Sequence, residues 1–269
     1  MRFDASHFRE IFQRGNRVLC VHSSLKHIGY IDGGPEKLIQ PLLDAAGDKG
    51  TLIMPVFTYS FEGRNEYIPF DLKHSPSQTG LLTEIFRTWP GTIRSNHPTH
   101  SFAARGNLAE YITSDHSQTS AFGINSPLHK LFNLGGMVLL FGTGFESCSL
   151  VHTAEVLANV YYKDIFCWEY LGWKPYARIA GPDGIVEQIP LPEVPGCSKN
   201  FGCAAQLIQT KGAVEQIRLG NTDALLINAG SFITEIVIKI GENPNLLLCT
   251  SDECPACRYR RESQGIRKL

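Results

Sequence analysis

The segment RVLCVHSSLKHIGYIDGGPEKLIQPLLDAAGDKGTLIMPVF (residues 17–57) decides the fold class. Its first six residues, 17–22, form an apolar run after a Gly-Asn turn and predict a β-strand. The Gly-Gly-Pro sequence at 33–35 opens a helix, because proline is favoured at the first helical position, and apolar residues then recur near period 3.6. A second apolar run, 51–57, predicts a strand that Pro55 interrupts or ends. This strand–helix–strand order is typical of an α/β protein.

The same alternation of apolar runs and helical patterns continues toward the C-terminus. Residues 137–141 (MVLLF) form a continuous apolar run between glycines, which is typical of a buried strand. Residues 181–184 (GPDG) separate two strand-like runs within 176–189 and predict the turn of an antiparallel hairpin. Further helical patterns are expected over 80–89, 107–112, 149–161, 201–210 and within 222–239.

These elements predict one mixed α/β domain over residues 1–269. It has a central, partly parallel sheet flanked by helices, and an antiparallel hairpin in the C-terminal half. No repeat with a period of 20–50 residues is present, which excludes a solenoid. Residues 245–269 form a tail rich in cysteine and arginine, whose role the sequence does not assign.

The composition excludes several classes of protein. With 43% hydrophobic and 19% charged residues, the chain can bury a core, unlike a disordered chain. The formal net charge of -1 argues against nucleic acid and anionic membranes as partners. The N-terminus, MRFDASHFRE, lacks the apolar stretch of a signal peptide, and no run approaches the ~20 apolar residues of a transmembrane helix. We therefore expect a cytoplasmic protein with mostly reduced cysteines.

Polar residues follow the first expected strand, at the edge where open α/β sheets usually bind ligands. Ser23 and Ser24 offer hydroxyl and backbone N–H groups, and Lys26 offers a positive charge. This combination suits a phosphate-bearing ligand. The segment contains neither a Walker A motif nor G-x-G-x-x-G. A serine-rich turn with a purely structural role is the alternative.

The segment RSNHPTHS (94–101) concentrates a guanidinium, two imidazoles and three hydroxyls in eight residues. An arginine fork such as that of Arg94 is well suited to phosphate. Polar loops of this kind often carry function. His97 and His100 lack a nearby third metal ligand, so a metal site is not indicated here. A polar surface loop is the alternative.

His152 and Glu155 lie three residues apart in the helix expected over 149–161, so their side chains share one face. A neutral imidazole can act as a general base, and a neighbouring carboxylate can orient it or attract a cationic substrate. A structural pair is the alternative. Cys148 and Cys167 flank this helix, which leaves nucleophilic catalysis by a Cys–His pair as a further alternative.

Three of the eight cysteines, Cys249, Cys254 and Cys257, lie close together near the C-terminus. The C-x-x-C pair resembles half of a zinc site, but a structural zinc site needs four ligands. Cys197, Cys203 or a histidine would have to complete it in space. A thiol-rich tail without metal is the alternative, and we assign no metal site from the sequence.

Seven segments together resemble the aminoglycoside 3-N-acetyltransferase family, whose acetyltransferases are distinct from the common GNAT enzymes. The resemblance covers roughly residues 5–240, and its most specific parts are the R-S-x-H-P-x-H-S and H-x-A-E patterns. The segments are VHSSLKHIGYIDGG (21–34), GTLIMPVFT (50–58), GLLTEIFR (80–87), RSNHPTHSFAARG (94–106), FGINSPLHKL (122–131), VLLFGTGFESCSLVHTAE (138–155) and VPGCSKNFG (194–202).

The resemblance implies transfer of an acetyl group from acetyl-CoA to an amine, through a ternary complex and without a covalent acyl-enzyme. His152 matches the family's catalytic histidine, with Glu155 as the second catalytic candidate. Glu84 and Glu155 are the expected contacts to a cationic amine, with Glu62 and Asp71 as further candidates. The residues that would meet coenzyme A are Ser23, Ser24, Leu25, Lys26, Arg94, Ser95, His97 and Ser101.

The segment after the second strand departs from the family pattern. Aminoglycoside-binding members have an acid-rich segment there, whereas residues 59–73 carry both acids and the cations Arg64 and Lys73. The expected function is still acetylation of an aminoglycoside antibiotic, with antibiotic resistance as the associated role. A different amine, such as an amino sugar or metabolite, is the first alternative. A protein that binds coenzyme A or zinc without transferase activity is the second. A homodimer is compatible with the sequence.

Overall fold

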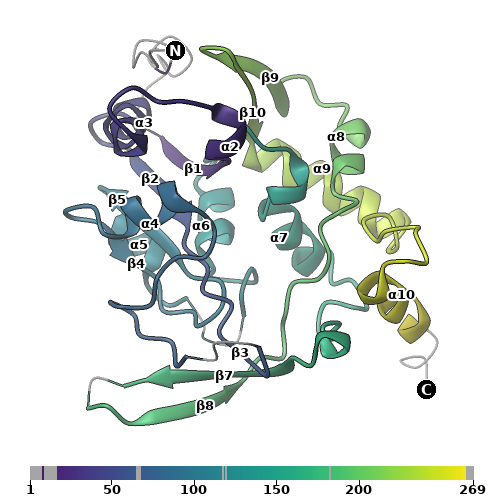
Figure 1. Ribbon diagram of the computed structural model, residues 1–269. Coiled ribbons are helices and arrows are strands. Elements are labelled where there is room, and N and C mark those ends of the chain that lie inside the picture. Colours follow the sequence, from purple (N-terminus) through teal and green to yellow (C-terminus); the bar gives the residue numbers. More distant parts are fainter. Residues whose placement is uncertain are drawn as a thin grey trace.

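A seven-stranded sheet forms the centre of the structure, a computed structural model that describes residues 8, 17–64, 68–116, 118, 120–181 and 183–264 (Figure 1). The strand order is β4-β5-β2-β1-β6-β10-β9. β1 pairs in parallel with β2 and β6, and the other neighbours are antiparallel. The strands are β1 (Val18–Ser23), β2 (Thr51–Pro55), β4 (Ile93–Arg94), β5 (Phe102–Gly106), β6 (Met137–Phe141), β9 (Val214–Leu219) and β10 (Thr222–Asn228).

Apolar side chains on both faces explain why β1 lies at the centre of this sheet. Successive side chains of a strand point to opposite faces. Val18 and Cys20 accordingly pack into one core, and Leu19 and Val21 into the other. All four side chains are buried. The apolar run that predicted this strand therefore reflects a sheet covered on both sides.

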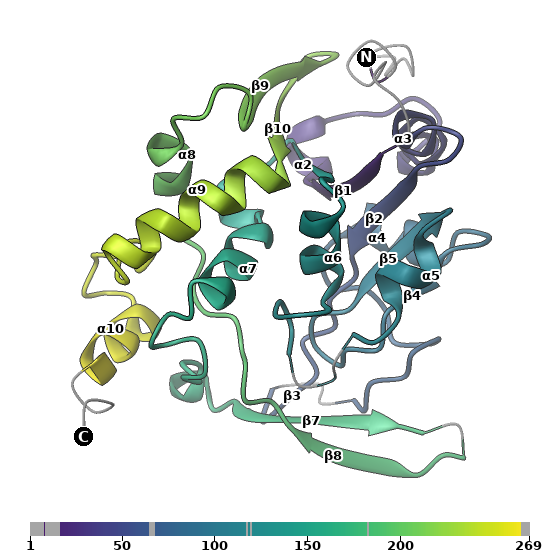
Figure 2. The same ribbon diagram turned by 180° about the vertical axis from the view of Figure 1, so that it is seen from behind.

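Helices cover the two faces and make three layers. One face carries a short 3₁₀ turn (Pro35–Leu38), α3 (Ile39–Ala46) and α4 (Leu81–Arg87), with α2 (Leu25–Ile28) at the end of β1. On the other face α6, α7 and α9 pack against one another (Figure 2). The helices of this second layer are α5 (Ala109–Thr113), α6 (Pro127–Asn133), α7 (Leu150–Leu157), α8 (Gly202–Leu207), α9 (Ala229–Glu242) and α10 (Pro255–Glu262).

A small antiparallel sheet lies beyond one end of the large sheet (Figure 1). It consists of β3 (Phe61–Glu62), β7 (Lys174–Ala180) and β8 (Val186–Pro190) in the order β3-β7-β8. β7 and β8 form the hairpin predicted from the GPDG sequence. The mixed α/β fold with a partly parallel, helix-flanked sheet and this hairpin is thus confirmed.

Residues 222–228 are a strand, although the sequence pattern predicted helix there. They form β10, which pairs antiparallel with β6 and β9. The helix α9 begins only at Ala229, where the Asn228 side chain accepts a hydrogen bond from Ser231 N at 3.0 Å as an N-cap. Apolar residues continue from β10 into α9 with little interruption. The change at Asn228 from the side-chain period of a strand to that of a helix therefore cannot be recognised in the sequence. β5, β9, α6 and α10 were likewise not predicted.

The core under the second helix layer allows a matched test of packing. Ile236 of α9 is 0% exposed, whereas Ile238 on the same helix is 57% exposed. We expect Ile236→Val to lower the free energy of unfolding by about 0.5–1.5 kcal/mol, because one methylene is lost from a packed interior. Ile238→Val is the control and should change it by less than about 0.5 kcal/mol. Urea unfolding checks both, and equal effects would contradict the assigned faces of α9.

Within the described part of the chain, no helix is both long and apolar enough to span a membrane.

Candidate active site

The main cavity opens at the carboxyl end of β1 and holds about 570 Å³. His22 and Ser23 from β1 and Pro55 from β2 form its floor, and His152 from α7 lines one side. Ligands of open α/β sheets usually bind at this edge, and the volume lies in the range of small-molecule sites. The cavity therefore brings together two of the segments singled out in the sequence.

Aromatic rings dominate the wall of the cavity. They come from the segment after β2, from β3, from the loop before α6, from the chain that leads into β7, and from the 194–201 loop. Charged side chains are few: among the described lining residues, Arg64 and Lys199 are cationic and Glu146 is the one carboxylate. The aromatic lining residues are Phe57, Tyr59, Phe61, Phe122, Trp168, Trp173 and Phe201. An organic substrate with both apolar and polar parts fits such a wall.

His152 presents one ring nitrogen to the cavity. Its Nδ1 lies 2.6 Å from Glu155 Oε2, and the side chain is 11% exposed. The ring stacks on Phe122 at 5.4 Å and meets Phe201 edge to face at 4.7 Å, so its orientation is fixed on both sides. No hydrogen bond from a described residue reaches Nε2. Because Nδ1 donates to the carboxylate, Nε2 carries the lone pair that can accept a substrate proton.

Glu155 acts behind His152 and does not line the main cavity. It is 5% exposed, and its second oxygen accepts a hydrogen bond from the Tyr162 hydroxyl at 2.9 Å. Burial raises the pKa of Tyr162, with the nearby Glu155 charge as a further cause, so the phenol stays protonated and donates. Both carboxylate oxygens are therefore used inside the protein. Glu155 is a positioning residue in this geometry. Because it does not line the cavity, its expected contact with a cationic amine stays a prediction.

We expect Glu155→Gln to lower kcat by about 10- to 100-fold, since it removes the negative charge from the acceptor of the His152 hydrogen bond, and hydrogen bonds to charged groups are worth about 1.5–3 kcal/mol. KM for acetyl-CoA should stay nearly constant, because Glu155 does not touch the cavity. Tyr162→Phe is the matched control, because it deletes only the hydrogen bond to the other carboxylate oxygen, keeps the bond from His152, and should cost less than Glu155→Gln. Steady-state kinetics separate the two, and a loss confined to KM would contradict this role.

Four buried histidines surround the cavity floor. His22 and His100 line it, while His97 and His116 stack below at a ring distance of 5.0 Å. Burial lowers the pKa of His22 and of His116 to about 4, and lowers the pKa of His97 and His100 well below the usual value. All four rings are therefore neutral at pH 7. Of these, the sequence reasoning had not assigned a role to His22, His100 or His116.

The 94–101 loop packs beneath the cavity. The Arg94 guanidinium donates to Val56 O at 2.9 Å, Ser75 O at 2.6 Å and Ser101 Oγ at 2.9 Å. Ser95, His97 and Ser101 are each 0% exposed, and none of these four side chains lines the cavity. They hold the chain that follows β2 in place. Their contact with coenzyme A stays a prediction.

The 23–26 segment lies at the edge of the cavity. Ser23 lines it, whereas Ser24, Leu25 and Lys26 turn away into the short helix α2. The Ser24 hydroxyl lies 3.0 Å from His27 Nδ1. Lys26 is exposed and forms no ion pair with a described residue. Its ammonium group is therefore available to an anion, in agreement with the expected phosphate contact, which stays a prediction.

The carboxylates expected to meet an amine are engaged elsewhere. Glu84 forms two hydrogen bonds with Arg87 and accepts one from Ser77 N. Burial would raise the pKa of Glu84, but these hydrogen bonds outweigh it and lower the pKa. Glu62 pairs with Lys174 at 2.9 Å and Asp71 with His74 at 3.0 Å. None of the three lines the cavity.

Glu146 is the carboxylate that the sequence reasoning missed. It lies in a short 3₁₀ turn (Phe145–Ser147) between β6 and α7, and accepts a hydrogen bond from Gly144 N at 2.9 Å. A signal was present, because Glu146 lies in the short loop that follows β6, the strand whose carboxyl end faces the ligand edge.

Cys148 does not have the environment of a catalytic nucleophile. It lines the cavity, but burial raises its pKa to about 12. The reactive form of cysteine is the thiolate, which is a small minority at pH 7 under these conditions. Burial also raises the pKa of Cys167 to about 11, and this residue lies outside the cavity wall. The geometry therefore does not favour a Cys–His mechanism.

A histidine held by a buried carboxylate, beside a large cavity, is typical of an enzyme that removes a proton from a bound substrate. A sequence model described as aminoglycoside 3-N-acetyltransferase matches residues 20–239. The chain therefore belongs to the aminoglycoside 3-N-acetyltransferase family, as the sequence resemblance implied.

Relatives with curated names agree with this family. Aminoglycoside N(3)-acetyltransferase VII of Streptomyces paromomycinus is 31% identical over 235 residues, which cover 79% of this chain and 81% of the relative. Aminoglycoside N(3)-acetyltransferase IV of a Salmonella species is 31% identical over 233 residues, which cover 86% of this chain and 83% of the relative.

Solved structures share the fold. The crystal structure of a histidine-to-alanine mutant of AAC(3)-IVa in complex with a gentamicin superposes with a TM-score of 0.80 at 28% identity and covers 96% of both chains. The AAC-IIIb structure, described as binary with CoASH, superposes with a TM-score of 0.75 at 28% identity and covers 88% of this chain and 94% of that one.

Proposed function

We propose that this protein is an acetyl-CoA-dependent N-acetyltransferase that acetylates an amine of an aminoglycoside. The observation that carries the proposal is the His152–Glu155 pair, whose unpaired Nε2 faces a cavity of about 570 Å³. The relatives crystallised with a gentamicin and with CoASH support the choice of both substrates.

The reaction follows from this geometry as a direct transfer. An acceptor bound as an ammonium first releases one proton to solvent. The neutral amine nitrogen then attacks the thioester carbonyl, and His152 Nε2 takes one proton from that nitrogen. Glu155 stabilises the imidazolium that forms, because it accepts the Nδ1 hydrogen bond at 2.6 Å. The tetrahedral intermediate then collapses, the C–S bond breaks, and the proton from His152 neutralises the leaving CoA thiolate. Binding both substrates in one cavity supplies the proximity that the step needs.

The 23–26 segment is the proposed entrance for coenzyme A. Ser23 lies on the cavity wall, and the exposed Lys26 lies outside it at the start of α2. This order suits a thioester inside the cavity and phosphates outside, where the ammonium group attracts them. The half-buried Arg94 and the buried Ser95, His97 and Ser101 would act from below by shaping the floor.

The charges of the cavity favour a second candidate acceptor. A polycationic aminoglycoside would meet Glu146 together with the cations Arg64 and Lys199. Arg64 stacks on the rings of Tyr59 and Trp173, each at 5.4 Å, so it is part of the wall. An amine with fewer positive charges, such as an amino sugar or metabolite, fits this lining as well.

A thiol-release assay tests the proposal. Purified protein is incubated with acetyl-CoA and a panel of aminoglycosides, amino sugars and simple amines, and free CoA is titrated. Release that saturates with an aminoglycoside supports the first candidate. Release with amino sugars alone selects the second. No release above the rate without acceptor, for any compound, would contradict an acetyltransferase.

We propose the cytoplasm as the compartment of this protein. We also propose that the protein can form a homodimer, and light scattering of the purified protein tests this oligomeric state. Growth of a host that expresses the gene, at increasing aminoglycoside concentrations, tests the antibiotic-resistance role.

A further inference from the structure

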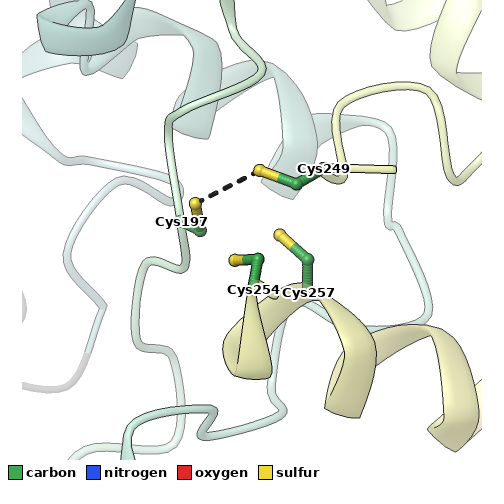
Figure 3. A group of neighbouring side chains, drawn as sticks. All are labelled: Cys197, Cys249, Cys254 and Cys257. Atoms are coloured by element: carbon green, nitrogen blue, oxygen red, sulfur yellow. Dashed lines mark hydrogen bonds between the residues drawn. The ribbon is translucent and has the colours of Figure 1, made fainter. Parts of the chain in front are cut away.

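Four cysteines from distant parts of the sequence meet beside the cavity (Figure 3). Cys249, Cys254 and Cys257 come from the C-terminal segment, and Cys197 comes from the loop that lines the cavity. Their Sγ atoms all lie within 4.8 Å of one another, and each residue is at most 8% exposed. Of the candidates that the sequence offered to complete the group, Cys197, Cys203 or a histidine, the structure brings in Cys197. Cys203 is not part of the group.

We propose that Cys197, Cys249, Cys254 and Cys257 bind one zinc ion in a closed structural site. In a tetrahedral zinc–thiolate site the Zn–S bonds are about 2.3 Å, which places the sulfur atoms about 3.8 Å apart. The observed group matches this size, with 3.5 Å between the sulfur atoms of Cys197 and Cys249. Four soft thiolates select zinc over hard cations such as magnesium or calcium.

The backbone around the cysteines is arranged to stabilise thiolates. Lys199 N donates to Cys197 Sγ at 3.4 Å. Cys254 is the N-cap of α10, and Cys257 follows in its first turn. The positive end of the helix dipole therefore faces the group. N–H donors to sulfur are the usual outer support of a metal–thiolate site.

The site would connect the C-terminal segment to the wall of the active site. Cys197 and Phe201 belong to the same cavity-lining loop, and the Phe201 ring contacts His152. From α10, Arg260 donates to Val194 O at 2.8 Å and stacks on Tyr162 at 5.1 Å. The family model ends at residue 239, so three of the four cysteines lie beyond it. Zinc here would hold the wall and take no part in the chemistry.

Metal analysis of the full-length protein, purified without chelator, tests the proposal. We expect about one zinc per chain in the wild type, less than about a tenth of that in Cys257→Ser, and the wild-type content in the control Cys203→Ser. Cys203 lies next to the same segment, with its thiol donating to Leu246 O at 3.5 Å, but outside the four-sulfur group. A zinc content that is unaffected by Cys257→Ser, or equally reduced in Cys203→Ser, overturns the site.

Two measurements on the wild type do not depend on whether a variant folds. X-ray absorption at the zinc edge should show sulfur neighbours only, at about 2.3 Å. Removal of the metal with a chelator under reducing conditions should lower the Tm by at least about 5 °C, and added zinc should restore it. After denaturation with chelator and no reductant, all eight cysteines should react with a thiol reagent. A shell containing nitrogen or oxygen, absence of bound metal, or a disulfide that hides two thiols overturns the proposal.

Discussion

His152→Ala is expected to lower kcat for acetyl transfer by about 10²–10⁴-fold, the usual contribution of a general base. The reason is geometric: Nε2 of His152 faces the cavity, while Nδ1 is held by Glu155 at 2.6 Å. Alanine removes the proton acceptor and leaves intact the 23–26 segment, which is the proposed contact to coenzyme A. Binding of CoA should therefore change little, which calorimetry with CoA can measure alongside kcat.

The control for this variant is His74→Ala. The His74 side chain is 82% exposed and pairs with Asp71 away from the cavity, so its loss should leave kcat unchanged. A His152→Ala enzyme that keeps near wild-type kcat would show that another group takes the proton. An acetylated protein detected by mass spectrometry, when acetyl-CoA is added without acceptor, would instead contradict direct transfer.

Mild acid is expected to destabilise the protein strongly. The folded state keeps His22, His97, His100 and His116 neutral, because burial lowers the pKa of each. In the unfolded chain a histidine has a pKa of about 6.5. The contribution of these neutral histidines to the free energy of unfolding is therefore fully present above about pH 6.5. It is lost as the pH falls toward the pKa values in the folded protein, which are about 4 for His22 and His116.

The loss can be measured by urea unfolding at pH 7.5 and 5.5. Linkage predicts a decrease in the free energy of unfolding of about 1.4 kcal/mol per buried histidine over this interval, and roughly 5 kcal/mol for all four together. His74→Ala should show the same decrease as the wild type, since that side chain is exposed. His116→Gln should be less stable at pH 7.5 but lose less on acidification. Equal wild-type stability at both pH values would refute the neutral histidine cluster.

The local sequence pattern was sufficient to predict the strands that form the ligand edge of the sheet. The apolar runs of β1, β2 and β6, and the turn between β7 and β8, could be predicted because side-chain period and turn residues are local properties. The pairing of His152 with Glu155 was also local, since residues three apart on a helix are neighbours. The family resemblance added the coenzyme and the acceptor, which no local pattern contains.

Features that depend on distant contacts could not be predicted. Cys197 meets Cys249 although 52 positions separate them, and only the fold brings the two thiols to 3.5 Å. The 94–101 loop is polar in sequence, yet Ser95, His97 and Ser101 are fully buried because they hydrogen-bond within the protein. The pattern within 222–239 predicts helix, yet residues 222–228 form β10, because its neighbours β6 and β9, and not its own pattern, determine its conformation.

The most direct test of the proposed reaction is mass spectrometry of the acceptor after incubation with acetyl-CoA and the wild-type protein. Gentamicin is a suitable first acceptor, since AAC(3)-IVa has been crystallised with a gentamicin. The expected result is a gentamicin product that carries one added acetyl group, in an amount equal to the CoA released, with almost none formed by His152→Ala. Release of CoA without any acetylated acceptor, for gentamicin and for every other amine supplied, would contradict the account.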